Sequence, residues 1–168
     1  MGGKKGEKYG VAIAVSEEKA ACSLMVTSNR IRAAPLELSI ENAKDKIARG
    51  VVITSGNANA FTGEQGRKDA ERICELVSAS FRMRKGDVIV NSTGIIGQRL
   101  DIDEIEGLIR SAAKDMQSND TGITNAANAM MTTDAFQKVA SRTVKTGGKD
   151  VKITGIAKGA GMIAPDLV

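Results

Sequence analysis

Four polar or glycine-rich segments of this 168-residue sequence could carry chemistry: residues 55–63, 91–97, 130–134 and 158–161. Each follows an apolar stretch that we interpret as a strand or a helix, so that backbone groups at its end can meet a ligand. Taken singly, each segment is more simply a turn or a helix end, because Gly, Asn, Ser and Thr are common there. Their joint arrangement therefore matters more than any one of them.

The segment at 91–97 offers the most specific chemistry. Gly94 has no Cβ, so its backbone N–H can face outward, and Thr93 provides a hydroxyl beside it. Two donors side by side at the end of a strand are what an oxyanion needs. We predict an oxyanion hole at Thr93 and Gly94, with a plain strand-to-helix loop as the alternative.

Missing residue types exclude several kinds of site. The chain contains no His, which removes Ser-His-Asp and Cys-His catalysis, His-ligated zinc and haem ligation within it. Its two cysteines, Cys22 and Cys74, cannot form a four-thiolate metal site, and their apolar neighbours favour buried, unreactive thiols. We expect neither a metal nor a cofactor.

Composition and charge favour a soluble globular protein. The sequence is 42% hydrophobic and 26% charged, which can build one domain or one lobe of a larger assembly. No apolar run approaches the roughly 18 residues of a membrane helix, and no signal peptide follows the polar start, so we expect a cytoplasmic location. The net charge of +4 is scattered and only 2% of the residues are aromatic, which argues against a nucleic-acid surface.

Alternating strands and helices are expected to position the four segments. Continuous apolar runs predict buried strands at residues 51–54 and 88–90. Helices are predicted over residues 64–81 and from Asp101 onward, the second with a capping box at Glu104. Their apolar stripes consist of Ala70, Ile73, Cys74, Val77 and Phe81 in the first, and of Ile105, Leu108, Ile109, Ala112 and Met116 in the second. This alternation implies an α/β layer in which both stripes pack on a sheet.

Turn residues mark two hairpins and one more helix. Residues 11–27 read as two apolar runs joined by a polar link, which predicts a hairpin. Ser39 is expected to cap a helix that runs to about Arg49. Near the end, a Gly-Gly turn predicts a second hairpin with strands at residues 139–145 and 151–156.

The order and spacing of these segments resemble a known family. The matching blocks are TSN at 27–29 followed by AAP at 33–35, SGNANA at 55–60, STGIIG at 92–97, MTTD at 131–134 and GIAKGAGMI at 155–163. Together they resemble the α chain of ornithine acetyltransferase, also called glutamate N-acetyltransferase, an enzyme of arginine biosynthesis. The resemblance spans about residues 9–168, essentially the whole chain.

The resemblance implies a layered α/β fold of the self-processing N-terminal-threonine acyltransferase and aminopeptidase type. Members are made as one precursor that cuts itself before a threonine, and the α and β chains then form an α2β2 heterotetramer. By this resemblance residues 1–168 are a single α-chain lobe, with a flexible N-terminus at 1–8, a processed segment at 157–168 and the cleavage site after Val168. A processed end would explain why the sequence stops on apolar residues.

The resemblance also implies a double-displacement reaction. The β-chain threonine takes acetyl from N-acetylornithine, ornithine leaves and glutamate accepts the acetyl group; acetyl-CoA serves as a second donor in bifunctional members. The α-amine of that threonine can act as the base, because its pKa of about 8 lies near working pH. Position in the motifs assigns Thr93 and Gly94 to the oxyanion hole. Thr132 and Lys158 match substrate contacts, and Lys158 suits the α-carboxylate of both substrates.

The sequence departs from the family pattern at a few positions. Phe61, Gln137, Ala164 and Val168 stand where the family commonly has Cys, Pro, His and Ala. Val168 bears on processing, because a β-branched residue crowds the carbonyl of the scissile bond. Two other interpretations remain open: an aminopeptidase of the same self-cleaving fold, and a non-enzymatic anion- or RNA-binding module suggested only by the isoelectric point of about 9.1.

Overall fold

Strands and helices alternate along the chain in the computed structural model, which describes residues 9–161 and 164–168. In chain order the elements are β1 (Gly10–Ala21), α1 (Ala34–Asn42), β2 (Ile47–Asn57), α2 (Gly63–Ser80), the 3-10 turn η1 (Lys85–Asp87), β3 (Val88–Ile95), α3 (Ile102–Lys114), α4 (Asp120–Ala129), β4 (Lys138–Thr146) and β5 (Lys149–Ala157). The flexible segment expected at 1–8, and residues Met162 and Ile163 of the last motif, lie outside the described residues.

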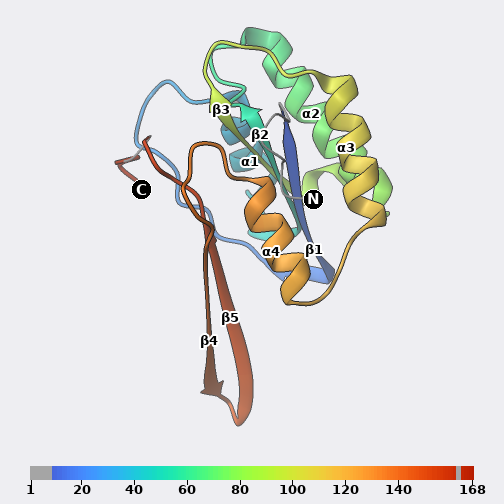
Figure 1. The fold of residues 1–168 in the computed structure, drawn as a ribbon, viewed down its shortest axis with the longest axis vertical. Coiled ribbons are helices and arrows are strands. Elements are labelled where there is room, and N and C mark those ends of the chain that lie inside the picture. Colours follow the sequence, from blue (N-terminus) through green and yellow to red (C-terminus); the bar gives the residue numbers. More distant parts are fainter. Residues whose placement is uncertain (1–8, 162–163) are drawn as a thin grey trace.

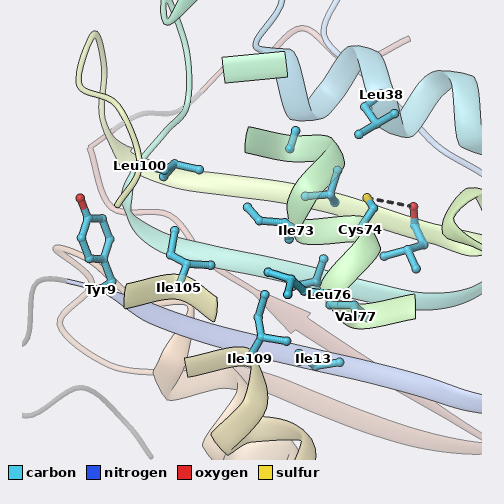
Figure 2. Packing of buried hydrophobic residues seen from close by; sticks show 14 residues of the cluster. Tyr9, Ile13, Leu38, Ile73, Cys74, Leu76, Val77, Leu100, Ile105 and Ile109 are labelled. Carbon is cyan, nitrogen blue, oxygen red and sulfur yellow. Dashed lines mark hydrogen bonds between the residues drawn. The ribbon is translucent and has the colours of Figure 1, made fainter. Parts of the chain in front are cut away.

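A three-stranded sheet in the order β1-β2-β3 forms the centre of the fold (Figure 1). β1 runs antiparallel to β2, whereas β2 and β3 are parallel. Because side chains alternate between the faces of a sheet, Ile13, Val52 and Val90, which lie opposite one another, share one face. That face packs on the helices and forms the core, in which Ile105 and Ile109 of α3 are also buried (Figure 2).

The predicted amphipathic helices are confirmed. α2 covers the range expected for the first helix, and Ala70, Ile73, Cys74 and Val77 of its stripe are completely inaccessible to solvent. The second begins after Asp101, whose carboxylate accepts the hydrogen bond from the Glu104 N–H at 3.2 Å, as the capping pattern requires. Figure 1 shows α2 and α3 side by side along the sheet. The strands expected at 51–54 and 88–90 lie inside β2 and β3.

The two cysteines differ in their burial. Cys74 lies in the core, where burial raises the pKa of its thiol to about 12, so the thiolate needed for reaction is scarce at neutral pH. Its Sγ lies 3.9 Å from the Val88 carbonyl oxygen, across the contact between α2 and β3 (Figure 2). Cys22 is only half-buried, so the prediction of a buried thiol is confirmed for Cys74 but not for Cys22.

The hairpin predicted over residues 11–27 is wrong. β1 continues through the polar stretch to Ala21 and pairs with β2 instead, with an irregular register between Val15 and Ala20. At such a register shift the extra residues bulge out and the strand continues beyond them. In the bulged stretch the Ser16 carbonyl accepts a hydrogen bond from Arg49 Nε at 3.1 Å. Long-range pairing therefore overrides the local turn signal.

The helix predicted from Ser39 to Arg49 is also misplaced. α1 begins five residues earlier in the chain, at Ala34, because Pro35 is well suited to the first helical turn. Ser39 is therefore inside the helix and buried, and its hydroxyl donates to the Val90 carbonyl at 2.6 Å and accepts from the Val90 N–H at 2.9 Å. These bonds satisfy backbone groups at the free edge of β3, a role that local sequence does not reveal.

The second predicted hairpin is confirmed. β4 and β5 pair in antiparallel register from Lys138 with Ala157 to Thr146 with Lys149, around the Gly-Gly turn. Figure 1 shows the hairpin projecting away from the central sheet, and nearly all of its residues are exposed. Within residues 9–161 and 164–168, none of the helices combines the length and apolarity needed to cross a membrane.

Candidate active site

The first two segments meet at the carboxyl ends of the parallel strands. Thr93 lies opposite Ser55, and Gly94 lies opposite Gly56. Beyond the strands, the Ala58 N–H donates to the Ile95 carbonyl at 2.8 Å, which holds the two loops together. Ligands of α/β proteins bind outside this edge of a sheet, so the prediction that these segments act together has a geometric basis.

Gly94 is required by packing as well as by any chemistry. Its φ of +134° is one that residues with a Cβ avoid, and a Cβ there would overlap the carbonyl of Gly56. It would also lie 2.8 Å from the Asn57 nitrogen. Replacing Gly94 would therefore disturb the contact between β2 and β3, so Thr93 is the better position at which to test the oxyanion hole.

The side chain of Thr93 lies on the face of the sheet that α4 covers. Residues opposite each other share a face, so Thr93 lies with Ser55, whose Oγ donates to the Ala129 carbonyl at 2.6 Å. Ala129 is the last residue of α4, so the third segment begins directly beside this edge. Ser92 faces the other way and its Oγ accepts from Thr54 Oγ1 at 2.8 Å.

The third and fourth segments meet at Asp134. Its carboxylate accepts hydrogen bonds from the Gly159 N–H at 2.8 Å, from Lys138 Nζ at 2.8 Å and from the Thr132 N–H at 3.4 Å. The pKa of Asp134 is lowered to about 2, chiefly by the Lys138 hydrogen bond and also by the two backbone hydrogen bonds, against the opposing effect of burial. Thr132 and the half-buried Lys158, which directly precedes Gly159, are thus brought to one place.

Asp134 is the residue that sequence reasoning missed. In the sequence it is only the last residue of the matching MTTD block, and no role was predicted for it. A signal was present in the spacing, since Lys138 follows four residues later and pairs with it. The decisive contact, with Gly159, joins residues 25 positions apart and is visible only in three dimensions.

The asparagines of the first segment serve the fold. Asn57 Nδ2 donates to the Tyr9 hydroxyl at 3.0 Å and to the Arg99 carbonyl at 2.8 Å. Asn59 Nδ2 donates to the Gly66 carbonyl at 2.8 Å, and both asparagines are buried. These bonds shape the loop that borders the strand ends. For Asn57 and Asn59 the structure therefore favours the simpler interpretation, in which they stabilise a turn, over a direct role in chemistry.

The end of the described chain is held against residues that follow β1. Val168 and Val26 exchange two backbone hydrogen bonds, at 2.8 and 3.0 Å, and the Ser28 N–H donates to the Asp166 carbonyl at 2.9 Å. Figure 1 shows this end beside the long blue loop after β1. The matching block at 27–29 therefore lies next to the candidate cleavage position.

The structure thus forms two groups of candidate residues. Thr93 and Gly94 lie at the strand ends, whereas Thr132 and Lys158 lie at the base of the β4–β5 hairpin. α4 links them, because its carboxyl end contacts Ser55 and its following residues lead to Asp134. An open hollow of about 660 Å³ lies elsewhere, between the amino-terminal turns of α2 and α3, and is lined by Lys68, Arg72, Arg99 and Asp103 among others.

A model of the ArgJ family matches residues 1–168. The chain belongs to the ArgJ family. It is 42% identical over 161 residues to a glutamate N-acetyltransferase of Methanothermobacter thermautotrophicus, an alignment that covers 95% of this chain and 40% of that protein. It is 41% identical over 165 residues to the arginine biosynthesis bifunctional protein ArgJ of Caldanaerobacter subterraneus, covering 98% of this chain and 40% of that one. The chain therefore spans about two fifths of the length of these ArgJ relatives.

Solved structures of the ArgJ family share the fold. The arginine biosynthesis bifunctional protein ArgJ of Bacillus halodurans superposes with a TM-score of 0.85 at 27% identity, over 96% of this chain and 92% of that chain. Ornithine acetyltransferase of Mycobacterium tuberculosis, solved in complex with ornithine, gives a TM-score of 0.86 at 28% identity, over 96% and 93%. The α/β fold implied by the resemblance is confirmed.

Proposed function

We propose that this chain is the α subunit of an acetyltransferase that moves acetyl from N-acetylornithine to glutamate in arginine biosynthesis. The observation that carries the proposal is the match of all 168 residues to the ArgJ family, with relatives named glutamate N-acetyltransferase at 42% identity. The meeting of the four segments in two linked groups supports it. We place the enzyme in the cytoplasm, in line with the polar start of the sequence.

The proposed reaction has two acyl-transfer steps. The hydroxyl oxygen of an N-terminal threonine on a β chain attacks the acetyl carbon of N-acetylornithine; the C–N bond breaks and ornithine leaves with a proton. The amine of glutamate then attacks the acetyl-threonine ester, which releases the threonine hydroxyl and gives N-acetylglutamate. The α-amine of the threonine carries the proton in each step, because its pKa of about 8 suits an acid–base role near neutral pH. Acetyl-CoA would enter as an alternative donor in the first step.

Thr93 and Gly94 would stabilise the oxyanion that forms in both steps. Negative charge develops on the acetyl oxygen as the tetrahedral intermediate forms, and fixed donors there lower the barrier. The parallel register holds the Thr93–Gly94 segment against Ser55 and Gly56, so neither donor has to be ordered during the reaction.

Thr132 and Lys158 would bind the substrate. N-acetylornithine and glutamate both present an α-carboxylate, and the Lys158 ammonium is the group suited to hold it. Support comes from the contact of both segments with Asp134, which places the two candidates together. One binding position for the shared part of both substrates is what a double-displacement enzyme needs.

A β chain from the same precursor would complete the enzyme as an α2β2 heterotetramer. We propose that the precursor is cut after Val168, whose backbone is fixed against Val26. The β4–β5 hairpin supports the proposal of a partner chain. An isolated two-stranded hairpin is only marginally stable, and this one exposes apolar side chains that a partner could cover. These are Val139, Val144, Val151, Ile153 and Ile156, each at least 38% exposed.

A transfer assay on the complete gene product tests this function. The enzyme is incubated with N-acetylornithine and glutamate, and N-acetylglutamate is measured by mass spectrometry. Glutamate-dependent release of ornithine supports the proposal. Release of acetate without glutamate, or hydrolysis of amino-acid amides instead, would replace it with a hydrolase of the same fold. Repeating the assay with acetyl-CoA as the donor separates a bifunctional from a monofunctional enzyme.

A further inference from the structure

The carboxylate of Asp134 closes the base of the β4–β5 hairpin. Only 1% of its side chain is exposed, although it lies in the loop between α4 and β4. Its donors come from three places: Thr132 in the same loop, Lys138 at the start of β4, and Gly159 just beyond the end of β5. The ladder already pairs Lys138 of β4 with Ala157 of β5, and the carboxylate adds the bonds that join the preceding loop and Gly159 to this end of the hairpin.

The hydrogen bond from Gly159 bears directly on Lys158. The Gly159 nitrogen belongs to the same planar peptide group as the Lys158 carbonyl, so fixing the direction of this N–H fixes the Lys158 main chain. The Thr132 N–H is held by the other carboxylate oxygen. One buried side chain therefore sets the relative position of the two candidate substrate contacts.

Charge balance leaves Lys158 available for an anion. Lys138 neutralises Asp134 at 2.8 Å, and its ammonium also lies 4.9 Å from the centre of the Phe136 ring, which holds it in place. With Asp134 neutralised in this way, the cluster of Asp134, Lys138 and Lys158 carries a net charge of about +1. A net positive, partly buried position suits a carboxylate ligand.

We propose that Asp134 is a positioning residue of the acyl-transfer site: it holds the Thr132 and Gly159 backbone so that Lys158 faces the substrate carboxylate. This inference rests on the proposed function and adds a residue to it. A residue that acts through Lys158 should have little effect once Lys158 is gone. A residue that only stabilises the hairpin should have the same effect whether Lys158 is present or not.

A double-mutant cycle on the complete gene product tests the proposal. The variants are Asp134→Asn, Lys158→Met and the two together, and the readouts are kcat and KM for N-acetylornithine and for glutamate. We expect Asp134→Asn to raise KM for both substrates about tenfold. In the Lys158→Met background the same change should raise KM by no more than about threefold, because only the longer 3.4 Å bond to the Thr132 N–H still bears on a substrate contact. Asp120→Asn is the matched control, because Asp120 pairs with Lys152 of the same hairpin at 3.3 Å but is 91% exposed.

Four outcomes overturn the proposal. KM effects of Asp134→Asn that are equal in both backgrounds would assign it a structural role only, and a normal KM in Asp134→Asn would remove it altogether. If the wild-type enzyme transfers no acetyl, the proposed function fails and this inference fails with it. If Asp134→Asn does not fold, Asp134→Glu replaces it: the longer side chain keeps the charge that Lys138 neutralises but displaces the bonds to the Thr132 and Gly159 N–H groups. That variant should also raise KM for both substrates, and an unchanged KM would contradict the proposal.

Discussion

Replacing Thr93 by Val tests the oxyanion hole most sharply. Val keeps the β-branched shape, and Thr93 lies inside β3, where β-branched residues are favoured. The change removes the hydroxyl with little change in volume at a half-buried position, so we expect stability to shift by less than about 1 kcal/mol. Turnover should fall much further, because losing one oxyanion donor costs about 3 kcal/mol in the barrier, or roughly 150-fold in kcat.

The assay is steady-state acetyl transfer from N-acetylornithine to glutamate, beside a thermal melt of the same sample. Ser92→Ala is the matched control, because Ser92 is the neighbouring residue but its hydroxyl bonds Thr54 on the other face of the sheet. Thr54 is completely buried, so the control should lose about 1 kcal/mol of stability and keep its turnover. A folded Thr93→Val enzyme with near-normal kcat, or an equal loss of turnover in Ser92→Ala, would refute the assignment.

Three further perturbations follow from the same contacts. Lys158→Met should raise KM for N-acetylornithine and glutamate alike by about 10- to 150-fold, the range for a charged hydrogen bond, whereas unchanged KM values in steady-state kinetics would indicate a solvated lysine. Lowering pH should remove about 2 kcal/mol of stability between about pH 4 and pH 2, because the pKa of Asp134 is depressed to about 2 and its contribution is lost as the carboxylate protonates. Thermal melts of Asp134→Asn over the same pH range should lack this loss of stability. If the variant and the wild type lose the same stability, Asp134 is not the group responsible. Ser55→Ala should lower the free energy of unfolding by about 1–2 kcal/mol, because the Ala129 carbonyl loses its 2.6 Å hydrogen-bond donor. An unchanged midpoint in denaturant unfolding would contradict this.

The elements that could be predicted are those with a repeating apolar pattern. The centres of the stripes of α2 and α3 and most of the apolar runs in β2 and β3 are buried where the pattern places them. Met116 is an exception, because α3 ends at Lys114 and the Met116 side chain is 40% exposed; Val51 of β2 is also exposed. The Gly-Gly turn between β4 and β5 is a local signal and is confirmed for the same reason. In each case the information needed lies within a few residues of the element itself.

The elements that were missed depend on partners far away in the chain. β1 passes through a polar stretch because β2, which lies far along the chain, supplies its partners; Arg49 Nε, for example, donates to the Ser16 carbonyl 33 positions earlier. Ser39 is a good helix cap in isolation, yet its hydroxyl bonds Val90, 51 residues later. Local propensity is outweighed by such pairings, because burial of a polar group requires a partner wherever one is available.

The candidate site divides in the same way. Thr93 and Gly94 could be expected from residue types at a strand end, and the parallel register with β2 now explains how they are held. The roles of Thr132 and Lys158 came only from the resemblance, since neither residue is distinctive alone. Asp134, which joins them, could not be found from sequence because its hydrogen bond to Gly159 closes a 25-residue interval.

The central claim, acetyl transfer through a second chain of the same precursor, can be tested in one labelling experiment. The complete gene product is incubated with N-acetylornithine carrying an isotopically labelled acetyl group, sampled by intact and peptide mass spectrometry, and then given glutamate. We expect the label first on the N-terminal threonine of a separate chain that begins after Val168, and then, after glutamate is added, on N-acetylglutamate. Transfer of label to glutamate without a labelled threonine, or an unprocessed chain that transfers acetyl equally well, would contradict it.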